Sequence, residues 1–555
     1  MMKNLLKLKN NWLLVTLVVL LAFFLRVNKV TEVPPSLNWD EVSIGYNAYS
    51  ILKTGKDEWG EFLPLHFKSY GEYKLPAQIY ASIPAIAIFG LNEFGVRITA
   101  VIYGALTILL LYFLAKELFD NKWIGLMSAF FLAISPWHIQ LTRASFESSF
   151  SVFWIVMGVW FLVKSFKNPK WLIMSVVPFA ISIYTYNSAR IFTPLFLVSM
   201  LFVFRKRVWT IKKESIIFAT LFFIALLPLV PFVLSGEASA RYKLVSITDD
   251  AGLIPRIEER RNLSKLPPVI TKLIHNRVTY VSFYFTQNYL AHFTPDFLFI
   301  NGAGHRQHHV QGIGELYAIQ APFWLAGWFY LFRKNHAYTY LILAWVLITF
   351  IPVSVTNDSI PNALRTLIAA PAYQILTAWG MYNVWLLLRD KKVVHASVWL
   401  VTGLILLFSF FGYLKSYYQN YPVLYSQDWQ YGYKQVISYI KDHYNDYDLI
   451  VFSRHYGEPH MFTLFFLNWD PANYQSSPNL DRFEANRWIW VLKFDKFYFP
   501  DLGDKGTKFE DIKKQNIGKR ILFIGKPDDF PEEVQKLLKV DFLNGSEAFE
   551  VVDSK

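Results

Sequence analysis

Residues 12–25 read WLLVTLVVLLAFFL, and the tetrapeptide NWDE follows at residues 38–41. The first stretch is continuously apolar, and because no A-x-A-like cleavage site follows it, we expect an uncleaved membrane helix. The second stretch places two adjacent carboxylates, Asp40 and Glu41, soon after that helix ends. A carboxylate pair at the mouth of a membrane bundle indicates chemistry at the membrane surface.

The composition is that of a polytopic membrane protein. Hydrophobic residues make up 54% of the 555 residues and charged residues 17%, and many apolar segments approach the roughly 20 residues that cross a bilayer. The absence of cysteine excludes disulfides, thiolate metal sites and a cysteine nucleophile. The net charge of +13 lies in short clusters between apolar segments, where Lys and Arg set topology and contact membrane lipid, so we predict no nucleic-acid partner.

About twelve apolar segments run through the chain. If all of them crossed, the first cationic cluster and the later ones would lie on opposite faces, against the cytoplasmic bias of Lys and Arg. The weakest segment is 77–91, which is short and carries Gln78, Tyr80 and Ser82. We expect it to lie in the membrane interface, which leaves about eleven crossings and a cytoplasmic N-terminus. The segments are residues 12–27, 77–91, 97–115, 123–138, 146–163, 171–187, 190–204, 215–234, 319–332, 337–356, 364–388 and 394–414.

The last part of the chain differs in character from these segments. Residues 433–443 have helical periodicity, and three later stretches have the pattern of short buried strands. We therefore expect a membrane catalytic domain over residues 1–414 and a small extracytoplasmic α/β domain over residues 415–555. The predicted strands are residues 449–453, 488–492 and 520–525.

The carboxylate pair has two interpretations. Asn38 or Asp40 is suited to cap a helix over residues 42–52, and acidic residues are favoured in a first helical turn without any catalytic role. Alternatively, Asp40 accepts the proton of an incoming hydroxyl or amine as a general base, with Glu41 as its neighbour in the site. We favour the second, because other candidate residues are expected on the same outer face.

Those other candidates are mostly cations on the outer face. Lys74 is either an anchor for lipid headgroups or a fixed charge for a lipid phosphate, and the flanking tyrosines and proline favour an ordered loop. Arg143, Arg190 and Arg365 lie at outer ends of crossings, together with the carboxylate of Glu147. Such residues are often plain topology markers, but Lys and Arg are biased inward, so outward ones are candidates for substrate binding.

The long loop over residues 235–317 holds further candidates. His292 precedes a TPDF stretch, and His305 and Arg306 belong to the sequence GAGHRQHH at residues 302–309. The three histidines of that stretch lack a metal-ligand spacing, so we expect a polar flexible loop that contacts an anionic leaving group. No cofactor is predicted with certainty, and a divalent metal is left open.

In order along the chain, several short motifs resemble the protein O-mannosyltransferase and aminoarabinose transferase group, which are polytopic glycosyltransferases of the GT-C class. The resemblance extends from about residue 12 to residue 413. Its motifs are Asp40-Glu41, Glu72-Tyr73-Lys74-Leu75-Pro76, Phe94-Gly95-Val96-Arg97, Ser135-Pro136 with Arg143 and Glu147, residues 186–190, and residues 292–299.

The resemblance implies a mainly α fold, a polytopic GT-C helix bundle with interfacial helices and a small α/β extracytoplasmic domain. It implies a sugar donor linked to polyprenyl phosphate, with Asp40 as catalytic residue, Lys74 near the donor phosphate and Glu147 as a second acidic residue. We therefore predict a membrane glycosyltransferase, a hexosyl or pentosyl transferase that acts with inversion on an acceptor outside the cytoplasm. The alternative is a transporter or lipid flippase, although the predicted crossings are nearly free of the charges that transporters carry at the midplane.

Overall fold

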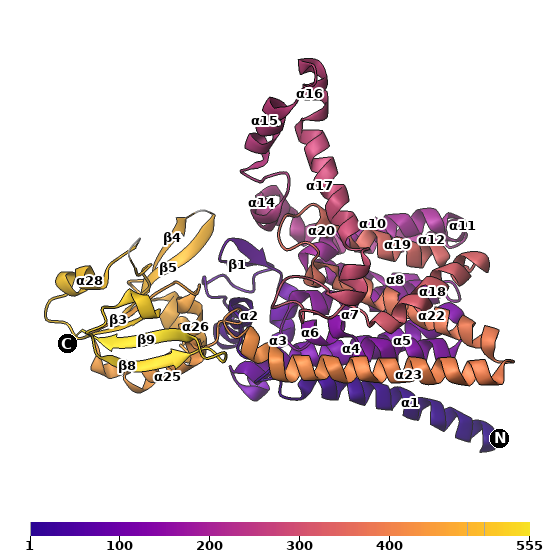
Figure 1. Ribbon diagram of the computed structural model, residues 1–555, viewed down its shortest axis with the longest axis horizontal. Coiled ribbons are helices and arrows are strands. Elements are labelled where there is room, and N and C mark those ends of the chain that lie inside the picture. Colours follow the sequence, from indigo (N-terminus) through magenta and orange to yellow (C-terminus); the bar gives the residue numbers. More distant parts are fainter. Residues whose placement is uncertain (1, 486, 504–505, 555) are drawn as a thin grey trace. The chain divides into compact units, whose positions relative to one another are not determined.

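The computed structural model describes residues 2–485, 487–503 and 506–554, with side chains described from Trp12 onward (Figure 1). It forms two compact units. The bundle unit comprises Met1–Asn28, Ala100–Thr142 and Glu147–Leu414, and the sheet unit comprises Lys29–Thr99, Arg143–Phe146 and Lys415–Lys555. The predicted division into residues 1–414 and 415–555 stays a prediction.

The bundle unit is helical throughout. Four of the described helical stretches are long and apolar enough to cross a membrane, namely Glu93–Phe119, Glu147–Lys164, Lys212–Leu234 and Lys392–Leu424. Six shorter apolar helices are found among the described residues, and one of them, Pro76–Phe89, belongs to the sheet unit. The predicted apolar segments are therefore helices, while the number of crossings stays a prediction. The helices are α1 (Met2–Val27), α4 (Glu93–Phe119), α5 (Lys122–Ile134), α6 (Pro136–Leu141), α7 (Glu147–Lys164), α8 (Lys170–Met174), α9 (Val176–Ile183), α10 (Asn187–Val203), α11 (Arg205–Thr210), α12 (Lys212–Leu226), α13 (Val230–Leu234), α14 (Ala240–Val245), α15 (Leu253–Leu263), α16 (Pro268–Ile274), α17 (Arg277–Ala291), α18 (Ala321–Arg333), α19 (Thr339–Thr349), α20 (Ile351–Ser354), α21 (Ala363–Thr366), α22 (Ala370–Leu388) and α23 (Lys392–Lys415).

Two glycines allow α18 and α22 to pack closely. A methyl group on Gly327 would overlap the carbonyl oxygen of Leu376, and one on Gly380 would overlap the carbonyl oxygen of Phe323. In a membrane, helices associate through such close contacts, because lipid removes the hydrophobic driving force between them. The backbone contact of α18 with α22 therefore depends on these two residues.

A buried arginine fastens α1 to its neighbours. Arg26 has no exposed surface, and it donates hydrogen bonds to Thr142 Oγ1 at 2.8 Å, to the Ala22 carbonyl at 2.9 Å and to the Ala133 carbonyl at 3.1 Å. A buried guanidinium is tolerated where its donors are satisfied. The C-terminal end of α1 is thus held in one position.

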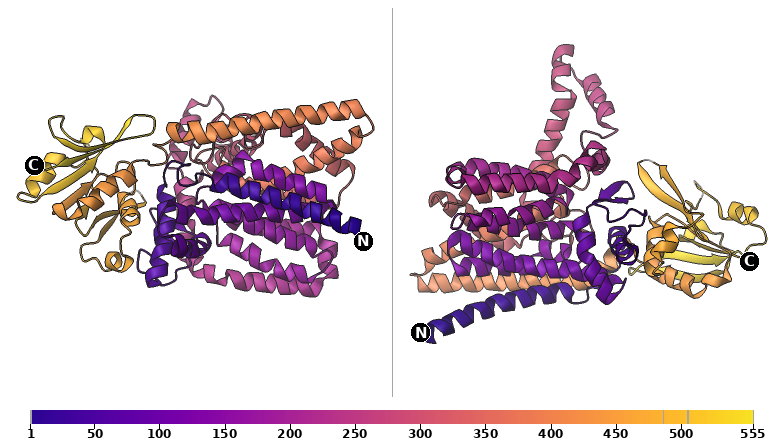
Figure 2. Two further views of the ribbon diagram at one scale, coloured as in Figure 1. Left: turned by 90° about the horizontal axis from the view of Figure 1, so that it is seen from below. Right: turned by 180° about the vertical axis from the view of Figure 1, so that it is seen from behind.

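The long connection over residues 235–317 contains helices that the sequence pattern did not predict. Helices α15, α16 and α17 form a hairpin that extends away from the other helices of the unit (Figures 1 and 2). Asn276 caps α17 in a capping box with Thr279, and Leu253, Ile257 and Tyr280 pack together between α15 and α17. These contacts join residues about 25 positions apart, so a local pattern does not reveal them.

The sheet unit contains a seven-stranded sheet with the strand order β4-β5-β6-β3-β7-β9-β8. Strand β3 pairs in parallel with β6 and β7, and the outer pairs are antiparallel. The three predicted strands are confirmed as β3, β5 and β7, and the predicted helix as α25. The strands of this sheet are β3 (Leu449–Phe452), β4 (Asp481–Ala485), β5 (Trp488–Phe494), β6 (Phe497–Tyr498), β7 (Ile521–Gly525), β8 (Lys536–Asp541) and β9 (Glu547–Asp553).

The sheet is covered on both faces. On β3, Ile450 and Phe452 face one core and Val451 faces the other, as the two-residue period of a strand requires. The larger core also includes residues of α2 and α3 from the first loop, so this loop and the C-terminal region share one hydrophobic core. The other elements of the unit are α2 (Trp39–Thr54), β1 (Phe67–Ser69), β2 (Glu72–Lys74), α3 (Pro76–Phe89), α24 (Tyr421–Leu424), α25 (Tyr433–Asp442), α26 (Pro459–Phe466), α27 (Pro471–Gln475) and α28 (Phe509–Gln515).

Helix α3 corresponds to the segment that we expected not to cross. Its 14 residues span only about 21 Å, less than the roughly 30 Å of a bilayer core. It packs against α2 within the sheet unit. Its interfacial position stays a prediction that its length supports.

Candidate active site

The carboxylate pair lies in the first turn of α2. Asn38 is the N-cap, since its side-chain oxygen accepts a hydrogen bond from the Glu41 amide at 2.9 Å. The Glu41 carboxylate accepts one in return from the Asn38 amide at 3.3 Å, which completes a capping box. Of the two capping residues that the sequence allowed, the structure therefore has Asn38, and Asp40 is not the cap.

Glu41 is fully committed to contacts inside the protein. Its carboxylate accepts two hydrogen bonds from the Arg97 guanidinium, at 2.8 and 2.9 Å, and one from the Ser145 amide at 2.9 Å. Neither Glu41 nor Arg97 has exposed surface. Arg97 also donates to the carbonyls of Val30 and Pro34, so the pair fixes the loop before α2.

Asp40 has a different environment from its neighbour. It accepts a hydrogen bond from the Lys74 ammonium, and its side chain is 36% exposed whereas that of Lys74 is 3% exposed. Lys74 is the last residue of β2, which pairs with β1 in a short antiparallel hairpin. The β1–β2 hairpin thus holds the nearly buried Lys74 ammonium against Asp40, the carboxylate of the pair that still reaches solvent.

Aromatic side chains surround this ion pair. The hydroxyl of Tyr70 donates to the Trp39 carbonyl at 2.8 Å, and the Tyr70 ring stacks on Trp488 with a centroid distance of 5.8 Å. The Lys74 ammonium lies 5.8 Å from the centroid of the Tyr70 ring. Trp488 comes from β5, so the C-terminal region contributes one wall of the surroundings of Asp40.

Two buried glutamates belong to the same unit and were not predicted from the sequence. Burial raises the pKa of Glu58 to about 7 and that of Glu458 to about 8. Glu58 accepts a hydrogen bond from the side-chain amide of Asn47 at 3.3 Å, and Glu458 accepts one from the Trp488 indole at 2.5 Å. The charge of Asp40 raises the pKa of Glu458 further, which places the two carboxylates within electrostatic range.

Arg143 is buried within the sheet unit. It donates to the Val33 carbonyl at 2.7 Å and to the Tyr418 hydroxyl at 2.9 Å, and it lies over the rings of Tyr417 and Tyr418. It has no exposed surface. A direct contact with substrate would therefore require these hydrogen bonds to break.

The bundle unit holds the remaining candidates, and Arg190 is the least satisfied among them. It lies in the first turn of α10 and donates one long hydrogen bond, of 3.4 Å, to Asn187. Within the part of the chain that the structure describes, its buried Nε and Nη2 atoms have no hydrogen-bond acceptor. The carboxylate of Glu147, at the start of α7, lies within electrostatic range of it.

Arg365 and His292 are satisfied by neighbouring protein groups. Arg365 donates to the Asp358 carboxylate at 2.6 Å and to Thr356 Oγ1 at 2.9 Å. His292 is buried, with Nδ1 2.7 Å from the Asn288 carbonyl and Nε2 accepting from the Asn362 amide at 3.1 Å. Burial lowers the pKa of His292 to about 4, so the ring is neutral and holds two loops together.

The histidine-rich loop is more ordered than the sequence suggested. The His309 and Glu315 side chains, both buried, approach to 3.1 Å, and Gly302 has a φ of 73° beside the His309 ring, where a methyl group would clash. His305 stacks on His308 at 3.7 Å, and Arg306 is exposed. The loop is therefore packed around the buried His309 side chain.

The metal that the sequence left open has no evident ligand set. Among the residues that the structure describes, no group of three or more His, Asp or Glu side chains is placed to hold a metal ion. Near Asp40, the position of a counter-cation is taken by Lys74, and the Glu41 oxygens are used by Arg97. The residues do not fit a metal site there.

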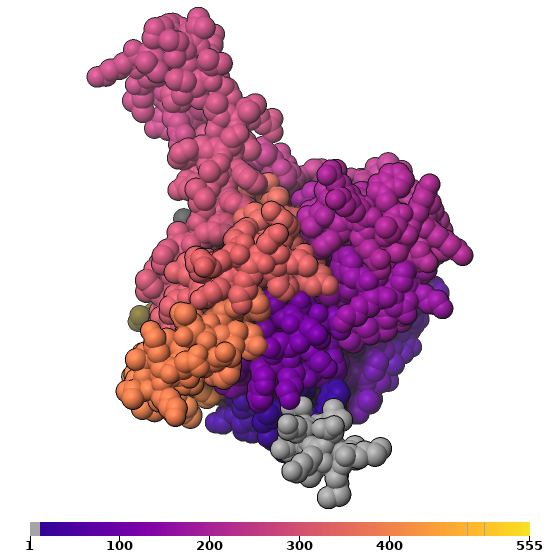
Figure 3. All heavy atoms as spheres, turned by 90° about the vertical axis from the view of Figure 1, so that its right-hand side faces the viewer, coloured from indigo at the N-terminus to yellow at the C-terminus, as the bar shows by residue number. Residues whose placement is uncertain are grey.

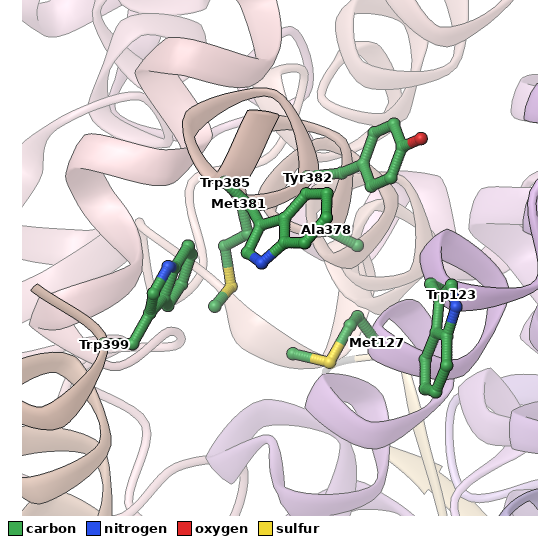
Figure 4. Close-up of a pocket in the computed structure, with 7 residues that line it drawn as sticks. All are labelled: Trp123, Met127, Ala378, Met381, Tyr382, Trp385 and Trp399. Carbon is green, nitrogen blue, oxygen red and sulfur yellow. The ribbon is translucent and has the colours of Figure 1, made fainter. Parts of the chain in front are cut away.

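Apolar side chains line two cavities among the described residues of the bundle unit. One, of about 470 Å³, lies among α5, α22 and α23, and Figure 4 shows indole rings and two thioethers around it. The other, of about 450 Å³, lies among α7, α8, α10, α11 and α12, and phenylalanines make up much of its wall. The first is lined by Trp123, Met127, Ala378, Met381, Tyr382, Trp385 and Trp399.

The comparisons with known proteins agree with this architecture. The family model of dolichyl-phosphate-mannose-protein mannosyltransferases matches residues 79–234. The structure of ArnT from Cupriavidus metallidurans bound to undecaprenyl phosphate is similar along nearly the whole chain, with a TM-score of 0.55, 13% identity and 98% of both chains covered. The chain has the GT-C glycosyltransferase fold. The predicted resemblance is thereby confirmed.

Archaeal relatives share the GT-C fold. The oligosaccharyltransferase AglB from Archaeoglobus fulgidus, in complex with an inhibitory peptide and a dolichol-phosphate, has a TM-score of 0.50 and 14% identity over 83% of this chain and 64% of its own. The Archaeoglobus fulgidus oligosaccharyltransferase in complex with Zn and sulfate has a TM-score of 0.50 and 15% identity over 82% of this chain and 61% of its own. The present chain thus spans less than two thirds of the length of these relatives. No curated protein matches the sequence significantly.

The long apolar helices of this fold make the chain a polytopic membrane protein, and the position of its C-terminal domain outside the cytoplasm stays a prediction. Three residues near the candidate site escaped the sequence analysis as functional candidates, namely Arg97, Glu58 and Glu458. Arg97 carried a usable signal, because it is another outward cation at the end of an apolar segment. The two glutamates carried none, since only tertiary contacts bury them.

Proposed function

We propose that this chain transfers a sugar, a hexose or a pentose, from a polyprenyl-phosphate-linked donor to an acceptor on the extracytoplasmic face, with inversion. The observation that carries the proposal is the pair of Asp40 and Lys74, a partly exposed carboxylate held against a nearly buried cation. The similar ArnT structure is bound to undecaprenyl phosphate and the AglB structure to a dolichol-phosphate, and the matching family uses dolichyl-phosphate-mannose, which supports the donor class. No observation favours the alternative of a transporter or flippase.

In the proposed reaction, Asp40 accepts the proton of the acceptor hydroxyl or amine as that atom attacks the anomeric carbon. The bond from the anomeric carbon to the phosphate oxygen breaks, and the electron pair leaves with the polyprenyl phosphate. A phosphate is a good leaving group, so stabilisation of its charge matters more than its protonation. One base and cations that bind phosphate are sufficient for direct displacement.

In this proposal Glu41 is a positioning residue that orients Asp40, although the sequence analysis predicted it as a catalytic candidate. Its carboxylate accepts hydrogen bonds from Arg97, Ser145 and Asn38, so no lone pair is directed at solvent. The pair of Glu41 and Arg97 fixes the first turn of α2 and hence the direction of Asp40. Glu147 is the second candidate for the base, should Asp40 not serve.

The phosphate needs cations, and Lys74 in the sheet unit and Arg190 in the bundle unit are separate candidates for this contact. Lys74 lies beside Asp40, and an arriving phosphate would compete with that carboxylate for its ammonium. In the bundle unit, Arg190 has two guanidinium nitrogens with no protein acceptor among the described residues, which suits a bidentate phosphate contact. Arg306 is exposed on its loop and remains a predicted helper, as do His305, Arg143, Arg365 and His292.

The isoprenoid chain of the donor requires an apolar surface within the membrane. The cavity among α7, α10 and α12 supplies one, because its polar contributions are limited to Ser165, Arg207 and Ser215. We assign the isoprenoid chain to this cavity. Its phenylalanines are Phe166, Phe204, Phe218, Phe222 and Phe223.

The orientation in the membrane follows from the Lys and Arg clusters, which place the N-terminus in the cytoplasm. A cysteine introduced at Asn121, at the N-cap of α5, tests it, because the natural chain contains no cysteine. The thiol should react with a membrane-impermeant maleimide only in inverted vesicles. Labelling from outside intact cells would contradict the assignment.

The decisive experiment measures sugar transfer by the purified full-length chain in nanodiscs. Lipid-linked sugars extracted from the source membrane are supplied, and release of polyprenyl phosphate is followed together with sugar incorporation. The wild-type chain should release polyprenyl phosphate in step with transfer, and Asp40→Asn should not. Donor movement across the bilayer without breakage of the sugar–phosphate bond would instead establish a flippase.

A further inference from the structure

The hairpin of α15, α16 and α17 carries a tip whose surface is both apolar and basic. Residues 260–278 contain five Lys or Arg residues and no Asp or Glu. The same stretch exposes seven large aliphatic side chains, and that of Val269 is 80% exposed. The cations are Arg260, Arg261, Lys265, Lys272 and Arg277, and the exposed aliphatic residues are Leu263, Leu266, Val269, Ile270, Leu273, Ile274 and Val278.

This exposure is not the result of an unformed hairpin. Arg261 donates to the His275 carbonyl at 2.7 Å, and the hydroxyls of Ser264 and Thr271 are 3.0 Å apart, which closes the tip from inside. Arg260 donates to the Tyr284 hydroxyl at 2.9 Å. The polar groups are thus satisfied within the hairpin, while the aliphatic side chains point outward.

The base of the hairpin fixes where the tip lies within the bundle unit. Asn288 of α17 donates to the carbonyls of Thr356 at 2.7 Å and Ser354 at 3.3 Å, and the Tyr289 hydroxyl donates to the Leu347 carbonyl at 2.9 Å. These carbonyls belong to α19, α20 and the residues just after them, which the cation bias places at the outer end of a crossing.

From this base, α17 runs crosswise to the long helices α4 and α23 (Figures 1 and 2). Figure 3 shows the hairpin standing clear of the remaining helices of the bundle unit. A segment that leaves a bundle crosswise at its outer end follows the membrane surface rather than extending into water. Its 15 residues carry the tip about 22 Å sideways from the base.

We infer that the hairpin tip is a docking surface for the membrane, one that inserts its aliphatic side chains among the headgroups of anionic lipids. An exposed apolar surface of this size is rare on a water-facing protein, and Lys and Arg in excess of acids are attracted to negatively charged lipid. The charge of the tip selects anionic lipid over a zwitterionic surface. The inference is independent of the proposed sugar transfer.

The test uses the full-length chain, whose lack of cysteine allows a single probe. A cysteine at Val269 is labelled with a polarity-sensitive fluorophore, and the protein is placed in nanodiscs of phosphatidylcholine, with or without an equal part of phosphatidylglycerol. The control is a cysteine at Ile517, which is 87% exposed in the sheet unit. Quenching by headgroup spin-labelled lipid is compared with quenching by iodide.

The Val269 probe should be quenched by the lipid label and protected from iodide, several-fold more strongly with phosphatidylglycerol, and the Ile517 probe should show the reverse. Lys265→Gln, Lys272→Gln and Arg277→Gln together should remove the preference for phosphatidylglycerol. Equal iodide quenching of the two probes in folded protein would overturn the inference. Cross-linking of Val269 cysteines between copies, with no dependence on lipid, would overturn it in favour of self-association.

A matched charge variant separates local from general effects. Lys508, Lys514 and Lys519 are exposed in the sheet unit, and their joint replacement by Gln removes the same charge as the tip variant. This control should leave the response of the Val269 probe to phosphatidylglycerol unchanged. An equal loss in both variants would show that net charge, and not the hairpin tip, attracts the lipid.

Discussion

The carboxylate of Glu41 accepts two hydrogen bonds from the guanidinium of Arg97, at 2.8 and 2.9 Å, with neither side chain exposed. The neighbouring Asp40 is bound by Lys74 and remains partly exposed. The two adjacent acids thus have different environments, because Glu41 is held inside the protein by Arg97 and Asp40 still reaches solvent. This difference leads to distinct expectations for their variants.

Glu41→Gln and Arg97→Lys should each lower the free energy of unfolding by about 3–5 kcal/mol, the usual cost of breaking a buried ion pair. Thermal unfolding of the purified variants measures the effect. Glu32→Gln is the matched control, since Glu32 and Lys29 form an exposed pair at 3.8 Å whose loss should cost little. An unchanged unfolding temperature for Arg97→Lys would remove the anchoring role.

Asp40→Asn should leave the fold intact and reduce turnover by roughly 10²–10⁴-fold, the range for loss of a general base. Asn retains the size of Asp but cannot accept the proton. Donor binding should persist, and Glu32→Gln again serves as the control for activity. If folded Asp40→Asn turns over at nearly the normal rate, Glu147 becomes the next candidate.

Lys74→Met should weaken both donor binding and turnover, because the phosphate charge is present in the donor and grows as the sugar bond breaks. Loss of one hydrogen bond to a charged group corresponds to roughly 10- to 100-fold, or about 1.5–3 kcal/mol. Equilibrium binding of the polyprenyl-phosphate sugar measures it. Lys68→Met, on the neighbouring strand β1, should have little effect on donor binding. Equal losses of donor affinity in both variants would indicate that the β1–β2 hairpin is disrupted.

Arg190→Gln should lower donor affinity without lowering the unfolding temperature, because two of its guanidinium nitrogens have no protein acceptor among the described residues. Arg365→Gln should do the opposite, since Arg365 is bound to Asp358 and Thr356. Comparison of donor binding with thermal unfolding for the two variants separates a substrate contact from a structural one. A stability loss in Arg190→Gln alone would reject its role in phosphate binding.

The buried glutamates predict a pH dependence of stability. Burial raises the pKa of Glu58 from 4.5 to about 7 and that of Glu458 from 4.5 to about 8, so the folded state favours their neutral forms. The corresponding stability is fully present below about pH 4.5 and is lost as the pH rises to 7 and 8. For Glu58 the shift corresponds to roughly 3 kcal/mol.

Glu58→Gln and Glu458→Gln should therefore unfold at a higher temperature than the natural chain at pH 8, with the difference shrinking toward pH 5. Thermal unfolding across this pH range measures it. Glu61→Gln is the control, because Glu61 is exposed nearby on the same loop. Parallel curves for the natural chain and both variants would contradict the assigned pKa values.

Several parts of the fold were predictable because their signals are local. The apolar segments became helices, Asn38 became the cap of α2, and short continuous apolar runs marked β3 and β7. The cation bias identified Arg143, Arg190 and Arg365 as expected exceptions on the outer face. In each case the physical cause acts over a few residues, through side-chain period, capping or charge at a helix end.

Other features were decided only by tertiary structure. Asp40 and Lys74 are 34 positions apart, and Glu41 and Arg97 are 56 positions apart. The local sequence therefore does not tell that Asp40 is partly exposed and that Glu41 is buried. The same holds for the hairpin that exposes Val269. Sequence by itself determined where helices, strands and candidate charges occur, and the packing of distant segments decided which charges are buried and satisfied, because burial and hydrogen bonding depend on contacts in space.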